Sequence, residues 1–448
     1  MSHEPAPVSD RRPQWRAWER LALLLFASVW VILQNNARIS DNVPDDARLS
    51  LLHIPRASRV IEAALLIGLF LVSQPRLVRA RLGDFSVLVS VFLVSALVSI
   101  ELTPTWLESQ FQGTYVYAAP LLLFGWAVSV RPTRPLLNRL LGLFSVCLGL
   151  SIAVALLVQL PVVRVKSDFI HGLFSDAHVL GAMLAIVSCV AFSRFMAVGG
   201  VRLLLLSVGL FLVSYYPANE KMIAFNLAWW AGALAWRLVK HPRSRRGLII
   251  GSAACAAVLW VAVARAEYVS DWFRVSDVTQ RNVLELGPFQ AWTRAGYVVL
   301  DSPSALIAGV GPGNFAGVAA ARALEDDPVR YRALSERAAS TLLDAEKDVA
   351  ALGWVANTWS NLLAEFGVLG FLLFAFALRR FSWPILRWRP ATRYDAVAKT
   401  VFLAGFGSIV WQGFITPYTN WSEPVLVYPT MVVAAYCYNA AADSDHGT

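Results

Sequence analysis

Three polar side chains recur at a spacing of four residues in the apolar stretch "GWVANTWSNLLAEFGVLGFLLF", residues 353–374. This spacing places Asn357, Asn361 and Glu365 on one face of a helix. An ionisable side chain inside a membrane helix is costly and usually faces a polar cavity or a partner. The stripe is therefore a candidate wall of a polar site. The other interpretation is ordinary hydrogen bonding between neighbouring membrane helices.

Cations and histidines form the second group of residues that could do chemistry. An arginine fork binds phosphate oxygens in pairs, and a lysine adds a point charge. Histidines also border helices, and lysines also snorkel from helix ends, so each residue has an ordinary interpretation too. Gathered at one membrane face, they would instead bind an anion such as a lipid-linked phosphate. The residues concerned are Arg164, Lys166, His171, His178, Lys221, Arg281 and Arg294.

Apolar runs of membrane-spanning length recur along nearly the whole chain. Of the 448 residues, 57% are hydrophobic and 15% are charged, a composition typical of polytopic membrane proteins. We expect an all-α fold with about twelve transmembrane helices. The expected spans cover residues 21–35, 59–74, 84–102, 114–131, 137–160, 177–196, 200–216, 221–238, 247–265, 354–378, 396–416 and 424–441.

The distribution of Lys and Arg predicts the orientation of these spans. Short loops rich in Lys and Arg mark the cytoplasmic side, and such clusters precede the first span and follow the second, fourth, eighth and tenth. Both termini are therefore expected in the cytoplasm, with the long segment 266–350 facing outward. That segment holds eight Lys and Arg against twelve Asp and Glu, so its arginines do not belong to a diffuse basic patch. The cytoplasmic loops explain the net charge of +9, and no nucleic-acid partner is predicted.

The outward segment is expected to form a helical cap over the membrane helices. Its first half predicts an amphipathic helix that ends before Pro303, followed by the turn "GVGPGNF" at residues 309–315. No metal motif, cofactor or disulfide framework is predicted, because the four cysteines all fall inside expected spans. The expected units are a cytoplasmic tail at 1–20, nine membrane helices at 21–265, the outward loop at 266–353, three membrane helices at 354–441 and a tail at 442–448.

Two of these stretches together resemble a known group of proteins. "GPFQAWTRAGYVVLDSPSALIAGVGPGNF", followed by "ANTWSNLLAEFGVLG", is similar to the C-terminal signature of the O-antigen ligase and Wzy-type polymerase superfamily. The match includes Asn357, Glu365, Gly367 and Gly370. "GLFSDAHVLGAML" is similar to a further stretch of that superfamily, with His178 where Asn is usual. "NEKMIAFNL" resembles its short basic motif, with Lys221 at the basic position.

The resemblance implies a glycosyltransferase C-like membrane protein of the bacterial inner membrane. It would act on the periplasmic face without metal or cofactor, using a glycan on undecaprenyl diphosphate as donor. An acceptor sugar hydroxyl would attack the anomeric carbon while the lipid diphosphate leaves. Fixed cations would stabilise the leaving diphosphate: Lys221, Arg281 and Arg294, with Arg164, Lys166 and His171 as further candidates for substrate binding. Pro288 stands where the family has an Arg, a role that Arg281 or Arg294 would then take.

Ala356 occupies the position of the superfamily's candidate base, a histidine, and a methyl group cannot take a proton. One interpretation is that the base is elsewhere, at Glu365, His171 or His178. A second is that proton removal matters little in a dissociative transfer. The remaining two are that the chain is an inactivated form, or a degenerate member with a non-catalytic role.

Four functions remain open on these grounds. The first is polymerisation of lipid-linked repeat units into exopolysaccharide or O-antigen. The second is a ligase reaction that moves the glycan onto lipid A-core. A lipid-linked oligosaccharide transporter is less favoured, because the polar groups cluster at one face and the two halves of the chain look unrelated. A scaffold within a polysaccharide export complex is the fourth, and other export components would then be its partners.

Overall fold

The computed structural model describes the chain in segments, and every regular element in them is a helix. The described residues are 17–28, 57–73, 104–163, 172, 177–214, 222–240, 253, 292, 295–296, 299–300, 302–312, 357–415 and 424–445. The helices are α1 (Ala17–Ser28), α2 (Ala57–Ser73), α4 (Pro104–Val130), α5 (Arg134–Val154), the π-helical turn η4 (Ala155–Gln159), α6 (Leu160–Val163), α7 (Ala177–Val198), α8 (Val201–Val213), α9 (Ile223–Lys240), α14 (Pro303–Ala308), α18 (Thr358–Arg387), α19 (Arg393–Ile415) and α20 (Pro424–Asp445).

Six of these helical stretches are long and apolar enough to cross a membrane. This confirms the coarser prediction, a helical protein with several membrane-spanning segments. The expected spans 84–102 and 247–265 lie outside the described residues, apart from residue 253, and every other expected span overlaps a described helix. The six stretches are Gly113–Val130, Arg134–Gln159, Val179–Val198, Thr358–Arg387, Arg393–Phe414 and Val425–Ser444.

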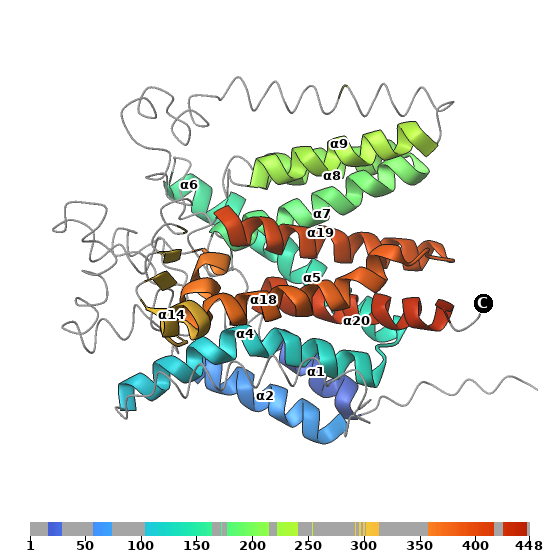
Figure 1. Cartoon of the computed structure of the whole chain (residues 1–448). Coiled ribbons are helices and arrows are strands. Elements are labelled where there is room, and N and C mark those ends of the chain that lie inside the picture. Colours follow the sequence, from blue (N-terminus) through green and yellow to red (C-terminus); the bar gives the residue numbers. More distant parts are fainter. Residues whose placement is uncertain are drawn as a thin grey trace, which may run out of the picture.

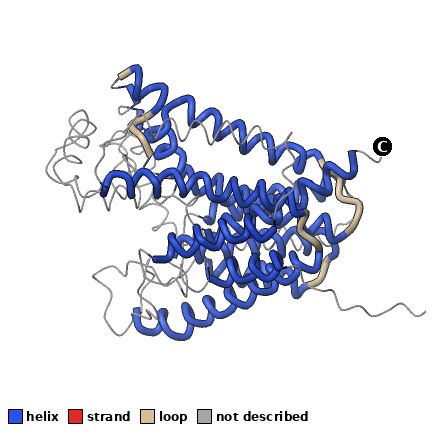
Figure 2. Tube along the Cα trace, turned by 90° about the horizontal axis from the view of Figure 1, so that it is seen from below, coloured by secondary structure: helices blue, strands red, loops and turns tan. Residues whose placement is uncertain are grey.

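The long helices run side by side as an up-and-down bundle (Figures 1 and 2). Two ends of this bundle are used below. At the Asn357 end, α18 and α20 begin and α19 finishes, and α14 lies beside the start of α18 (Figure 1). At the Arg134 end, α5 and α19 begin and α18 and α20 finish.

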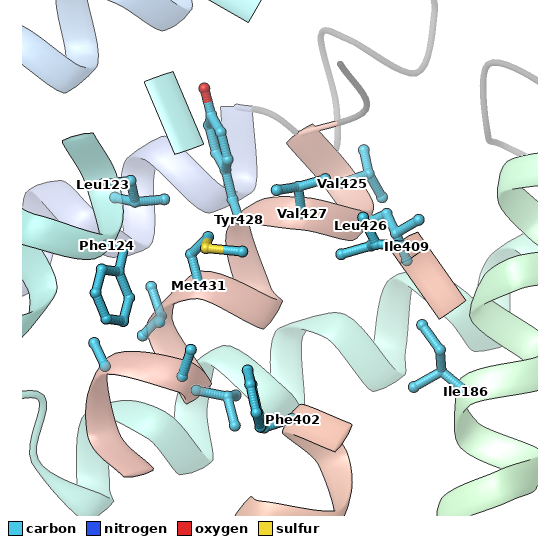
Figure 3. Packing of buried hydrophobic residues seen from close by; sticks show 14 of the residues in the cluster. Leu123, Phe124, Ile186, Phe402, Ile409, Val425, Leu426, Val427, Tyr428 and Met431 are labelled. Carbon is cyan, nitrogen blue, oxygen red and sulfur yellow. The ribbon is translucent and has the colours of Figure 1, made fainter. Parts of the chain in front are cut away.

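Helix α20 lies in the middle of the bundle and contacts α4, α5, α7, α18 and α19. Figure 3 shows its residues from Val425 to Met431 among side chains of α4, α7 and α19, including Phe124, Ile186 and Phe402. Towards the Arg134 end, Asn439 Nδ2 donates to the Val128 carbonyl at 3.1 Å, and the Phe124 and Tyr438 rings meet edge to face with centroids 5.8 Å apart.

Small residues let the helices of this core approach closely, as is typical of membrane bundles. A Cβ at Gly413 of α19 would lie 2.5 Å from Trp359 Nε1 of α18, and one at Gly405 would lie 2.7 Å from Thr430 Oγ1 of α20. Trp359 Nε1 donates to the Val410 carbonyl at 3.1 Å. The start of α18 is thereby fixed against the last turns of α19.

A network of charged and hydroxyl groups closes the Arg134 end. The Asp395 carboxylate of α19 receives Arg134 Nη2 of α5 at 3.2 Å and the Tyr436 hydroxyl of α20 at 2.7 Å. Thr392 Oγ1 donates to its other oxygen at 2.7 Å. Tyr436 also accepts from Arg134 Nε at 3.0 Å. These four side chains bond to one another, and the network joins α5, α19 and α20.

Candidate active site at the Asn357 end

Asn357 caps α18 instead of lying on its face. The span expected near residues 354–378 corresponds to α18, which begins at Thr358. The Asn357 side chain accepts from the Ser360 amide at 2.9 Å, and the Ser360 hydroxyl pairs with the Asn357 backbone, which makes a capping box. Asn357 Nδ2 also donates to the Phe414 carbonyl of α19 at 3.0 Å. The side-chain amide of Asn357 is used for these structural bonds. This supports the interpretation of Asn357 as a residue that hydrogen-bonds neighbouring helices.

Asn361 lies one turn further along, and only part of its bonding capacity is used. Its Nδ2 donates to the Tyr117 hydroxyl of α4 at 2.9 Å. Its Oδ1 is buried and has no hydrogen-bond partner among the residues that the structure describes. A buried acceptor without a donor is costly unless a water or ligand supplies one. Asn361 Oδ1 can therefore accept a hydrogen bond from a hydroxyl group of a bound molecule.

Glu365 follows one turn later and is almost completely buried, at 1% exposure. Its carboxyl interacts electrostatically with the Tyr117 hydroxyl. The Tyr117 ring in turn packs edge to face against Phe366, with centroids 5.4 Å apart. We call Tyr117, Asn361 and Glu365 the Glu365 cluster. It brings a proton-accepting group and an amide oxygen together under the Asn357 end of the bundle.

The helix breaks directly after this cluster, where the sequence predicted a continuous span. Gly367 has φ 64° and ψ −173°, a backbone conformation open essentially only to glycine. Such a break takes carbonyls of the preceding turn out of the helical ladder. Those of Ala364 and Glu365 accept instead from the amides of Val310 and Gly311, each at 2.9 Å. The break is thus closed by a segment from another part of the chain.

That segment is the glycine-rich turn after α14, which we call the docked turn, residues 309–311. Ser302 caps α14 by accepting from the Ala305 amide, and Pro303 occupies its first turn. Gly309 and Gly311 then take positive φ angles of 74° and 94°. The predicted turn is confirmed over 309–312. Its place on α18 was not predicted.

Glycine is required on both sides of this contact. A Cβ at Gly309 would run into the backbone of Glu365 and Phe366. A Cβ at Gly367 would run into the carbonyl group of Ile307 and would lie 2.6 Å from the Gly309 amide nitrogen. The two backbones therefore touch without side chains between them. The two stretches that carry the resemblance, "GVGPGNF" and "AEFGVLG", meet at this point.

Aromatic rings pack around the same end. Trp292, which belongs to the tryptophan-containing stretch of the segment 266–350, stacks on Phe414 of α19 with centroids 6.0 Å apart. It also meets Phe371 of α18 edge to face at 6.2 Å. Phe414 further contacts the Trp359 ring at 6.0 Å. Residue 292 is helical, as predicted, and its ring contacts side chains of both α18 and α19.

Of the predicted site residues outside α18, the structure describes His178. His178 lies in the first turn of α7. The remaining candidates lie outside the described residues: Ala356, Arg164, Lys166, His171, Lys221, Arg281 and Arg294. Their roles stay predictions. Gly172, which directly follows His171, is described: its N–H donates to Gln159 Oε1 at 2.8 Å, and its carbonyl accepts from Gln159 Nε2 at 3.1 Å. These two bonds connect Gly172 to η4.

Sequence reasoning missed Tyr117, Gln159 and the pairing of Gly309 with Gly367. Tyr117 lies in the apolar run "YVYAAP". Nothing in this run indicates that its hydroxyl accepts a hydrogen bond from Asn361, which lies far along the chain. Gln159 was the easier case, because it interrupts an apolar span and a buried amide needs partners.

The part of the chain that the structure describes contains no group of three or more His, Cys, Asp or Glu that could hold a metal ion. The Glu365 cluster offers a buried carboxyl, an amide and a phenol. Compared with models of protein families and with curated proteins, the chain matches none, so what bears on its function is the geometry of the Asn357 end.

Proposed function

We propose that the protein is a glycosyltransferase that joins lipid-linked oligosaccharide repeat units into exopolysaccharide or O-antigen at the periplasmic face of a bacterial inner membrane. The observation that carries the proposal is the docking of the glycine-rich turn on the break of α18, directly beside Glu365. Both segments belong to the sequence signature, and they meet over a buried carboxyl group. A signature whose parts assemble around a potential proton acceptor supports an enzyme site.

The proposed orientation follows from the described cations. From α4 onward, the described lysines and arginines all lie towards the Arg134 end, which the positive-inside rule assigns to the cytoplasm. The Asn357 end would then face the periplasm, where an undecaprenyl-diphosphate donor presents its glycan. These cations are Arg131, Arg134, Arg139, Arg194, Arg202, Arg237, Lys240, Arg379, Arg380, Arg387, Arg389, Arg393 and Lys399.

In the proposed reaction, the oxygen of an acceptor hydroxyl forms a bond to the anomeric carbon of the donor. The bond from that carbon to the diphosphate oxygen breaks, and the diphosphate leaves with the electron pair. The hydroxyl proton passes to a base. We propose Glu365 as the base, because its carboxyl is buried at the Asn357 end on the turn of α18 that the docked turn contacts, with Asn361 Oδ1 orienting the hydroxyl.

Glu365 and Asn361 are 1% and 3% exposed, so a sugar reaches them only when covering side chains move. The docked turn bonds to the backbone of Glu365, and the ring of Trp292 packs on Phe371 and Phe414 at the same end of the bundle. Stabilisation of the leaving diphosphate is assigned, as a prediction, to Lys221, Arg281 and Arg294.

The test uses the purified protein in lipid nanodiscs with undecaprenyl-diphosphate-linked oligosaccharides extracted from the source bacterium. We expect a ladder of products with this donor alone. Product that forms only when lipid A-core is added would instead establish the ligase reaction. Absence of product under both conditions, in the wild type and in Ala356→His, would contradict the enzyme proposal and favour a scaffold. Asp395→Asn, at the other end of the bundle, serves as the matched control.

A further inference from the structure

The part of α18 that carries Asn361 and Glu365 is a short helix, Thr358–Phe366, cut off by the break at Gly367. A helix of about two turns is not stable by itself in water, since isolated helices become marginal below about 12–15 residues. Its position in the protein therefore depends on bonds to its surroundings. The described contacts of this half-helix fall into two groups of different origin.

The first group comes from other membrane helices. The Asn357 side chain is bonded to the Phe414 carbonyl, and the Trp359 indole to the Val410 carbonyl, which fixes the start of the half-helix on α19. Asn361 is bonded to Tyr117 of α4. These contacts hold the first turn and one face. Tyr117 also reaches the last turn, where its ring packs against Phe366, so this contact acts on side chains.

The second group comes from the docked turn, and it acts on the last turn itself. Gly311 N–H donates to the carbonyl oxygen of Glu365, and Val310 N–H donates to that of Ala364. Both bonds come from backbone, and the glycines at 309 and 367 keep the two backbones in contact. Any shift of the docked turn relative to α18 must therefore strain or break the bonds at Glu365.

We propose that the docked turn sets the position of the Glu365 carboxyl, so that Gly309 and Gly367 are positioning residues for the reaction. This rests on the proposed function for its kinetic consequence. The outward segment and the broken membrane helix act as one unit at this point. A contact that serves only stability would change the amount of folded protein, whereas a positioning contact changes the rate of the bound complex.

The first experiment measures amide hydrogen exchange and needs no substrate. In the wild type, the amides of Val310 and Gly311 must exchange as slowly as those in the interior of α18; fast exchange there overturns the proposal. In Gly309→Ala and Gly367→Ala, we expect these amides and those of residues 362–366 to exchange about tenfold faster, the loss of roughly one hydrogen bond. Unchanged exchange in both folded variants would also overturn it.

Matched controls are available on α5. Gly142 and Gly149 are helical glycines around which a Cβ would meet nothing within 4 Å. Gly142→Ala and Gly149→Ala should leave the exchange at residues 309–311 and the transfer rate unchanged. A general effect of adding a methyl group to a membrane glycine is thereby separated from an effect of the docked turn.

The second experiment measures transfer in the same variants. We expect kcat to fall by about 100-fold in Gly367→Ala, with KM within about twofold of the wild type, because displacement of a catalytic group by about 1 Å has an effect of this size. Faster amide exchange with unchanged kcat would show that the docked turn holds α18 without positioning Glu365, and would refute the inference. A wild type without transferase activity would contradict the proposed function alone, and the exchange experiment would still decide the docking.

Discussion

The two buried carboxylates at opposite ends of the helix bundle have different surroundings. At the Arg134 end, Asp395 meets a guanidinium and two hydroxyl groups within 3.2 Å, and Arg134 extends to the surface with half of its side chain exposed. At the Asn357 end, Glu365 lies in a cluster with Tyr117 and Asn361, and the amide oxygen of Asn361 has no donor among the described residues. The Arg134 end pairs its carboxylate with a cation, whereas at the Asn357 end the amide oxygen of Asn361 can accept a hydrogen bond from a ligand.

This difference separates a structural polar network from a candidate site. A carboxylate bonded to a cation and two hydroxyls stabilises the contacts of three helices, and it has little basicity left for chemistry. A carboxyl in an apolar setting with a neutral amide beside it can exchange a proton with a substrate. We therefore expect substitutions in the network at the Arg134 end to change stability and those of the Glu365 carboxyl at the Asn357 end to change activity.

The largest effect is expected from Glu365→Gln, which keeps the shape of the side chain and removes the proton acceptor. We expect kcat to fall by about 100-fold or more, as is typical when a general base is lost. The midpoint of thermal unfolding in detergent should change little. A variant that retains the wild-type rate in the nanodisc assay would show that Glu365 is not the base.

The next largest effect is expected at Asp395, where stability and not activity should change. Asp395→Ala leaves Arg134, Tyr436 and Thr392 without their shared partner, so we expect a loss of about 2 kcal/mol in the free energy of unfolding. Transfer per folded molecule should stay at the wild-type value. The comparison between the two ends fails if Asp395→Ala lowers kcat while the protein stays folded.

Helix caps offer a smaller and more closely matched comparison. Asn357 caps α18 with a bond of 2.9 Å and also bonds to α19, whereas Thr133 caps α5 with a longer bond of 3.4 Å. We expect Asn357→Ala to cost about 1–2 kcal/mol and Thr133→Ala about half of that, measured by chemical denaturation. Asn357→Asp, which keeps the capping oxygen, should recover most of the loss.

The smallest effect is expected at Lys399, whose Nζ donates to the carbonyls of Leu386 and Trp388 at 2.9 and 2.6 Å. It caps the end of α18 opposite to Asn357. Lys399→Met should lower the free energy of unfolding by about 0.5–1 kcal/mol, because a cation near a helix C-terminus contributes about this much. Equal losses in Lys399→Met and Asn357→Ala would show that both ends of α18 are held equally.

The sequence predicted the helical class and most of the described helices, because apolar length is a local signal. It also predicted the turn at 309–312, since glycine and proline act on the backbone where they stand. The capping role of Asn357 was missed, because a polar residue every fourth position was read as a helix face. The same residue type, Asn, is strongly preferred at the N-cap position.

The long-range parts of the site could not be predicted. Tyr117 and Asn361 are 244 residues apart, and no periodicity links them. The break at Gly367 was hidden inside an apolar run, where glycine is common in membrane helices. Its partner Gly309 belongs to a different segment, so only the folded chain shows that each glycine makes room for the other.

The central place of α20 has a consequence for synthesis of the protein in the cell. The Asn439 side chain of α20 bonds to the Val128 carbonyl of α4 across 311 residues of sequence. At about 5–20 residues per second, roughly 15–60 s pass between the translation of these two positions. During that time α4 stays in the membrane without its main neighbour, and ribosomes that stop before Pro424 release a bundle with an open centre. Such truncated chains are expected to be substrates for membrane proteases.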